Sequence, residues 1–272
     1  MIAGFDHVVI AVRDLAAATA AYETLLGRSA QRQDTRDGVA TTLIALDNTA
    51  VELIAPDGEG EGGQRLIAAL ESGEGLKSLV FATPDIERLH TRCERVGLDP
   101  AAIGPPASSR HSASTWRTFR TNTQRTNGVR LFFLERDTPL TPSPRTDSSV
   151  LGLDHVVIRS ADMERAAALY GARLGLDMRL DREVRGHRLM FFRCGDAIVE
   201  IAHDASRKTD QLWGLSWRVA NADAARERLA STGADVSEVR QGMKLGTRVF
   251  TVRDNTCGVP TLMIEQNSAS DA

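Results

Sequence analysis

Two histidine–glutamate pairs recur along the chain at the same spacing. His7 and Glu52 lie in short apolar stretches near the beginning, and His155 and Glu200 stand 148 residues later. Imidazole and carboxylate groups are ligands for Zn²⁺, Ni²⁺, Mn²⁺ and Fe²⁺, and a carboxylate can also act as a general base. These four side chains are therefore the first candidates for chemistry in this sequence.

The two pairs belong to a larger duplication. Residues 5–10 read FDHVVI, and residues 153–158 read LDHVVI. A stretch with helical spacing of apolar residues follows each of them and ends in Leu-Gly, with Tyr22 and Tyr170 at the same place. Three matches in one register indicate a tandem repeat.

Each copy divides again into two smaller modules. Residues 85–97 and 222–233 have helical spacing and end in glycine, and short strands rich in Val, Ile and Phe flank them. The order predicts four βαβββ modules and an α+β fold. Residues 138–149 are rich in Pro, Ser and Thr, which is typical of a linker. We therefore expect one domain at 1–137, a linker at 138–150 and a second domain at 151–268.

Four such modules, each pair opening with a DHV-type strand, resemble the vicinal oxygen chelate superfamily. It includes glyoxalase I, methylmalonyl-CoA epimerase, extradiol dioxygenases and bleomycin-resistance proteins. The resemblance implies that two modules form a half-barrel whose concave face binds a divalent metal or, in some members, a ligand without metal. Isomerases, lyases, dioxygenases and plain binding proteins share this fold, so the resemblance leaves the activity open.

The resemblance also implies which residues would hold a metal, since the family's ligands lie on the first and last strands of each module. His7, Glu52, His155 and Glu200 match these positions. In the second and fourth modules the histidine position falls on Ser78 and Gly214, and the glutamate position on Phe132 and Leu262. An extradiol dioxygenase is therefore disfavoured. A metal remains an expectation if the modules bring the four side chains together; otherwise each His–Glu pair hydrogen-bonds within its own sheet or binds ligand directly.

Other side chains could hold a ligand. Arg117 and Arg248 fall in equivalent strands, where each could bind an anionic group or pair with the glutamate of its own domain. Trp213, Trp217 and Arg218 flank the fourth module's empty position and could hold a planar or aromatic ligand beside His155 and Glu200. For the tryptophans the alternative is a place in the core. Because the first domain has no such set, we expect the second domain to carry the function.

Composition narrows the class of protein further. The 272 residues are 42% apolar and 25% charged with a net charge of −3, so no basic field exists for nucleic acid. No apolar run is long enough for a membrane span, and three scattered cysteines suit a reducing compartment. We expect a cytoplasmic protein, monomeric or homodimeric.

The leading hypothesis is a glyoxalase-like protein that binds a small anionic, oxygen-rich or aromatic metabolite. As an enzyme it would be a metal-dependent isomerase or lyase, with Glu200 or Glu52 as the base. The alternative is a metal-free binding or resistance protein of the bleomycin-resistance type.

Overall fold

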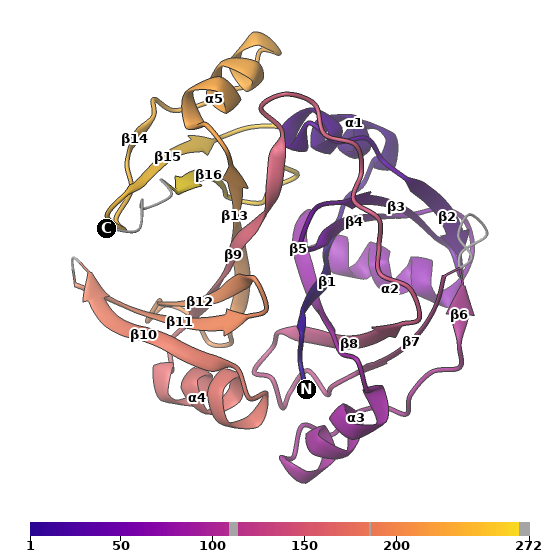
Figure 1. Cartoon of the computed structure of the whole chain (residues 1–272). Helices are drawn as coiled ribbons and strands as arrows, with labels where there is room; N and C mark the ends of the chain where they lie inside the picture. The colour runs from indigo at the N-terminus through magenta and orange to yellow at the C-terminus, as the bar shows by residue number, and fades with distance from the viewer. Residues whose placement is uncertain (109–113, 185, 267–272) are drawn as a thin grey trace. The chain divides into compact units, whose positions relative to one another are not determined.

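The computed structural model describes residues 1–108, 114–184 and 186–266, and four βαβββ modules follow one another along the chain (Figure 1). Module 1 contains β1 (Gly4–Ala11), α1 (Leu15–Leu26), β2 (Arg32–Arg36), β3 (Val39–Ala45) and β4 (Ala50–Pro56). Module 2 contains β5 (Gly75–Ala82), α3 (Ile86–Arg95), β6 (Ala107–Ser108), β7 (Thr115–Arg120) and β8 (Arg130–Arg136). A further helix, α2 (Glu61–Leu70), connects the two modules.

The second half of the chain repeats this order. Module 3 contains β9 (Val150–Ser160), α4 (Met163–Ala167), the π-helix η1 (Ala168–Arg173), β10 (Asp177–Val184), β11 (His187–Cys194) and β12 (Ala197–His203). Module 4 contains β13 (Gln211–Val219), α5 (Ala222–Ser231), β14 (Arg240–Gln241), β15 (Thr247–Val252) and β16 (Thr261–Gln266). The α+β fold of two tandem domains is confirmed.

The described strands form two eight-stranded sheets, one from each half of the chain. Their strand orders are β2-β3-β4-β1-β5-β8-β7-β6 and β10-β11-β12-β9-β13-β16-β15-β14. Within modules 2, 3 and 4 the first strand pairs in parallel with the last, and the last pairs antiparallel with the strand before it. Among the described residues, no helix combines the length and the apolar character that a membrane span requires.

Short polar residues begin the predicted helices. The side chains of Asp14, Asp85, Asp162 and Asn221 each accept a hydrogen bond from the backbone N–H three residues later, as N-caps do. Gly27 ends α1 in the left-handed region at φ 64°. One feature differs from the sequence expectation, because the helix after Asp162 continues as a π-helix. The Gly- and Glu-rich stretch after β4 leads into α2.

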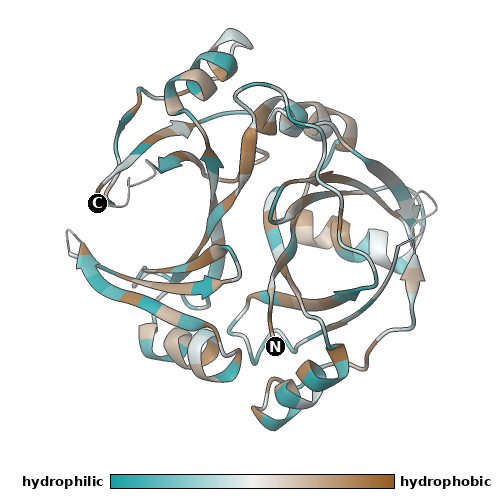
Figure 2. Ribbon diagram, in the orientation of Figure 1, coloured by the Kyte–Doolittle hydropathy of each residue, from teal (hydrophilic) through white to brown (hydrophobic). Residues whose placement is uncertain are grey.

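The core lies where strands meet helices. Val156, Ile158, Val199, Ile201 and Phe192 are fully buried on the side of β9, β11 and β12 that faces α4 and η1, with the Phe192 ring 6.0 Å from that of Tyr170. Figure 2 shows the contrast between strands, because β1 is mostly hydrophobic and the edge strand β10 is mostly hydrophilic. Burying one face of each strand fixes the sheet register.

Contacts divide the chain into two compact units that each combine modules from both halves. The first compact unit contains residues 1–9, 77–140 and 155–213, and the second contains residues 10–76, 141–154 and those from 214 onward. Module 2 therefore packs mainly with module 3, and most of module 1 packs with module 4.

Arginines at helix ends join the modules within each unit. In the first unit, Arg92 of α3 donates to the carbonyls of Ala172 and Arg173, and Arg173 donates in return to those of Val96 and Gly97. In the second unit Arg228 of α5 donates to carbonyls near the end of α1. Carbonyls at helix C-termini lack partners within the helix and carry partial negative charge, which explains why cations bind there.

The predicted linker is held by a buried arginine. The guanidinium of Arg28 is fully buried and donates to the carbonyls of Ser143, Val150 and Leu151 and to the carboxylate of Asp47. Gln31 also donates to the Thr141 carbonyl.

Arg28→Ala is expected to destabilise the protein by about 3 kcal/mol or more, because several buried carbonyls would lose their donor. Urea-induced unfolding measures the change. Arg145→Ala is the matched control, since Arg145 is 54% exposed and reaches the same Asp47 carboxylate at 3.4 Å; its effect should stay below about 1 kcal/mol. Equal losses in both variants would contradict this assignment.

The paired tyrosines of the repeat differ in hydrogen bonding. Both are fully buried; Tyr22 donates to the Thr256 carbonyl at 3.1 Å, while the Tyr170 hydroxyl has no partner among the described residues. Tyr22→Phe should cost about 1 kcal/mol of stability, whereas Tyr170→Phe should be neutral or stabilising. Thermal melting of both variants tests the difference, and a larger loss for Tyr170→Phe would refute it.

Candidate functional site

The structure brings His155 and Glu200 together on one face of the second sheet. Val157, two residues after His155 on β9, is the register partner of Glu200 on β12, so all three side chains share a face. His155 Nε2 lies 3.4 Å from Glu200 Oε2, and the side chains are 15% and 13% exposed. This is the face opposite α4 and η1. A polar pair is thus held on the sheet face that the helices leave uncovered.

Aromatic and cationic groups flank this pair. Arg159 follows on the same face of β9, with its guanidinium carbon 4.1 Å from the ring centroid of Trp213 and Nη1 3.6 Å from Asp204. Phe191 of β11 is the register partner of Glu200. The indole of Trp213 is 37% exposed. Sequence analysis singled out Trp213 but missed Arg159, whose position on the strand could have indicated it.

A second arginine borders the same face. Arg182 of β10 is the register partner of Leu189 on β11, and its guanidinium carbon lies 6.0 Å from the Phe191 ring centroid. The buried Nε of Arg182 has no hydrogen-bond partner within the described residues. Guanidinium groups beside aromatic rings suit a planar ligand that carries a carboxylate or similar anion.

In module 1, His7 is tied to a buried ion pair. Nδ1 of His7 lies 2.6 Å from Oδ1 of Asp6, and the Arg136 guanidinium donates to both Asp6 oxygens at 2.6 and 2.8 Å. Burial alone would raise the pKa of Asp6, but the hydrogen bonds from His7 and Arg136 outweigh it and hold the pKa well below its usual range. Glu52 lies half-buried on β4 opposite Leu43 of β3.

The strand register supports the predicted gaps in the ligand set. In module 3, Val157 lies two residues after His155 and is the register partner of Glu200. In module 2, the residue two positions after Ser78 pairs in the same way with Phe132. In module 4, the residue two positions after Gly214 pairs with Leu262. Within the described parts of the chain, no three His, Cys, Asp or Glu side chains are grouped so that they could hold a metal ion.

Arg117 and Arg248 do not pair with Glu52 or Glu200, contrary to one expectation. Arg117 forms ion pairs with Glu87 of α3 and Glu135 of β8. Arg248 lies 2.7 Å from Asp223 of α5 and 3.4 Å from Glu265 of β16. The reason is strand alternation, which turns both arginines toward the helices. Their guanidinium groups hold carboxylates of their own modules, and ligand binding by either arginine stays a prediction.

The three predicted residues around Gly214, the position where the fourth module lacks a ligand, do not share one environment. Trp217 is fully buried, so its indole belongs to the core and cannot form a ligand wall in this conformation. Arg218 donates to the Leu153 carbonyl at 3.1 Å and lies 3.5 Å from Asp154. Trp213 borders the His155–Glu200 face through its contact with Arg159.

The βαβββ modules, the paired sheets and the His–Glu pair define a glyoxalase-type protein, and comparison with known families agrees. The glyoxalase-like domain family matches residues 5–175, and the Glyoxalase/Bleomycin resistance protein/Dioxygenase superfamily matches residues 154–251. The chain belongs to the glyoxalase-like domain family.

Relatives with several different activities share the fold or the sequence. Ethylmalonyl-CoA/methylmalonyl-CoA epimerase of Cereibacter sphaeroides is 33% identical over 113 residues, which cover 41% of this chain and 84% of the relative. A mutant 4-hydroxymandelate synthase from Streptomyces coelicolor superposes with a TM-score of 0.76 at 14% identity, covering 100% and 95% of the chains. The Mn(II)-bound glyoxalase from Novosphingobium aromaticivorans gives 0.70 at 15% identity, covering 97% and 82%. The two structures show the shared fold alone.

Asp210, which sequence analysis missed, is a buried carboxyl just before β13. Asn127 donates to it at 2.7 Å, while its Oδ2 has no hydrogen-bond partner among the described residues. Burial raises the pKa of this carboxyl, and the hydrogen bonds from Ser160 and Asn127 offset only part of the rise.

A raised pKa means that the folded protein holds this proton more tightly than the unfolded chain, so stability falls as the pH rises above about 3.8. Asp210→Asn should therefore stabilise the protein at neutral pH, and the gain should vanish in acid. Unfolding midpoints measured across pH test this. Asp204→Asn is the control of opposite sign, because hydrogen bonds from Ser206 lower the pKa of Asp204. Destabilisation by Asp210→Asn at neutral pH would contradict the assignment.

Proposed function

We propose that this chain is an isomerase-type glyoxalase-like enzyme whose centre is the His155–Glu200 pair. Its substrate would be a small organic acid or acyl ester with an acidic carbon next to a carbonyl group. The observation that carries the proposal is the approach of His155 and Glu200 at 3.4 Å, half-buried on a sheet face beside Arg159 and Trp213. The epimerase of Cereibacter sphaeroides supports this reaction class, because an epimerase inverts a single centre.

Each side chain has a chemical role that its position allows. The Glu200 carboxylate would remove a proton from the carbon next to the carbonyl, and return of a solvent proton to the opposite face of the enolate would invert that carbon. His155 lies against Glu200 and would orient it or donate to the oxygen on which negative charge develops. Arg159 would bind the anionic group of the substrate, and the Trp213 ring that it stacks on would cover the planar part.

A divalent metal, which the superfamily implies, does not fit the residues around this pair. A catalytic site for such an ion normally uses three protein ligands. His155 and Glu200 supply two, while the matching positions in module 4 hold Gly214 and Leu262, which offer no ligand atom. A Zn²⁺, Ni²⁺, Mn²⁺ or Fe²⁺ site built from His7, Glu52, His155 and Glu200 stays a prediction that metal analysis would test. The proposed mechanism therefore uses the side chains alone.

Exchange of the substrate's acidic proton with D₂O is the direct test. Purified protein is incubated with 2-substituted malonyl thioesters and with 2-oxo and 2-hydroxy acids, and the loss of the proton signal is followed by NMR. The wild-type protein should catalyse exchange in at least one class, and Glu200→Gln should slow it by about 100-fold or more because it removes the base.

The duplication supplies the control. Glu52→Gln changes the equivalent residue in module 1, where Ala11 stands in place of Arg159 and Lys77 in place of Trp213, and it should leave exchange within about threefold. Equal loss in the two variants, or exchange unaffected by Glu200→Gln, would contradict the assignment. Stoichiometric metal that disappears in His155→Ala and Glu200→Gln would overturn the metal-free mechanism.

A metal-free binding protein is the second candidate. It is favoured by the replacement of half the ligand positions, since a binding protein needs the flanking Arg159 and Trp213 but no base. Ligands that raise the melting temperature without proton exchange, with binding unaltered in Glu200→Gln and weakened in Trp213→Ala, would favour this function over the enzyme.

A further inference from the structure

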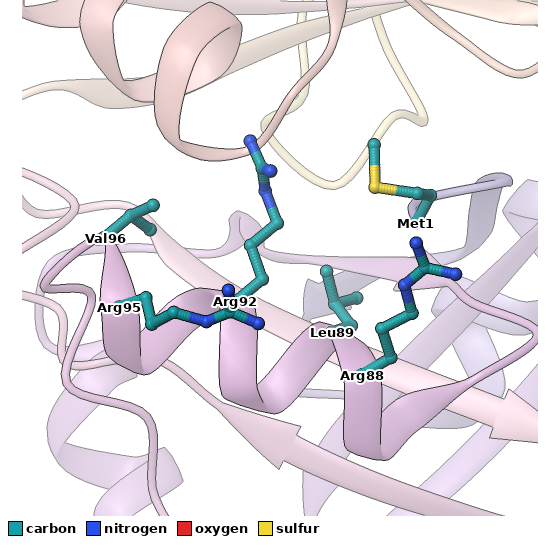
Figure 3. Close-up of a pocket in the computed structure, with 6 residues that line it drawn as sticks. All are labelled: Met1, Arg88, Leu89, Arg92, Arg95 and Val96. Atoms are coloured by element: carbon teal, nitrogen blue, oxygen red, sulfur yellow. The ribbon is translucent and has the colours of Figure 1, made fainter.

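A pocket of about 260 Å³ lies beside α3 in the first compact unit (Figure 3). Its lining consists of three arginines and three apolar side chains: Met1, Arg88, Leu89, Arg92, Arg95 and Val96. The arginines are spaced four and three residues apart, which places them on one face of the helix. The pocket therefore combines an apolar surface with a row of positive charge.

The middle arginine is fixed by the fold. Arg92 extends away from α3 in Figure 3, and its guanidinium donates to the carbonyls of Ala172 and Arg173 at the end of η1. Gly175, which follows η1, lies against the same guanidinium and the Met1 side chain. Arg92 thus holds its charge at the pocket but is already used in joining the two helices.

The outer two arginines of the pocket do not join helices as Arg92 does. Arg88 and Arg95 are exposed, and neither forms an ion pair or a side-chain hydrogen bond within the described residues. Arg88 and Arg95 lie about 10 Å apart along the helix axis at 1.5 Å per residue. Two guanidinium groups therefore remain for a ligand.

The repeat shows which of these arginines the fold requires. Counting from the N-caps Asp85 and Asn221, Arg92 corresponds to Arg228, which contacts helix-end carbonyls in the same way. Arg88 and Arg95 correspond to Ala224 and Ser231. The pocket between α1 and α5 in the second compact unit is lined mainly by alanine and leucine, with Asp254 and no arginine. The helix packing therefore does not need Arg88 or Arg95.

We propose that the α3 pocket binds an organic anion that carries a diphosphate group, such as a nucleoside diphosphate. Guanidinium groups bind phosphate oxygens through paired hydrogen bonds, and two of them spaced along a helix suit linked phosphates better than one carboxylate. The apolar side chains of Met1, Leu89 and Val96 would contact part of the attached organic group. This site is separate from the His155–Glu200 pair, so each assignment stands or fails independently.

Calorimetric titration of the full chain, with any tag at its C-terminus, tests the proposal with three probes: inorganic pyrophosphate, ADP and adenosine. Pyrophosphate and ADP should bind, ADP more tightly, and their affinity should fall as salt screens the charges. Adenosine, which has no phosphate, should bind far more weakly. Absence of binding by both anions at millimolar concentration, or equal binding of adenosine, would overturn the proposal.

The double variant Arg88→Ala/Arg95→Ala should weaken ADP binding by about tenfold or more. Arg36→Ala/Arg240→Ala removes the same charge from exposed arginines outside the pocket and should change affinity less than about twofold. Both variants should keep the wild-type melting temperature closely, because none of the four side chains is buried. Equal weakening in the two double variants would show a general charge effect and would refute the site.

Discussion

Parallel pairing of the first and last strands within a module fixes where the candidate side chains lie. In module 3 the register places His155, Val157 and Glu200 on one face, and turns Val156 and Val199 toward the helix. A slip of one residue would bury the imidazole and carboxylate and expose the valines. The free energy of burying the apolar face therefore also enforces the approach of the two polar groups.

Comparing equivalent residues in the two halves distinguishes the interactions that the fold requires from the residues that have changed in one half. Arg92 and Arg228 contact helix ends in both compact units, so this interaction belongs to the fold. Where module 3 carries Arg159, module 1 carries Ala11, so the cation that stacks on Trp213 has no equivalent in the other half. This difference supports the proposal that the function lies in the second half of the chain.

The repeat allowed the fold to be predicted, because helix caps and strand alternation are local patterns that the sequence displays directly. The approach of His155 to Glu200 within one sheet was one of two alternatives that the same alternation left open. The partners of Arg117 and Arg248 did not follow from it, since they depend on which sheet face the helices cover. The π-helix after α4 and the burial of Trp217 depend equally on packing between distant segments, which periodicity does not report.

Each compact unit combines modules from both halves of the chain, and this affects how far the fold depends on an unbroken peptide between the halves. Because Arg92 and Arg173 come from opposite halves of the chain yet exchange hydrogen bonds at each other's helix ends, the peptide between the halves is not what holds them together. A molecule nicked by protease near residue 140 should remain associated. By the same logic, two separately expressed halves should find each other in solution and complement one another as fragments.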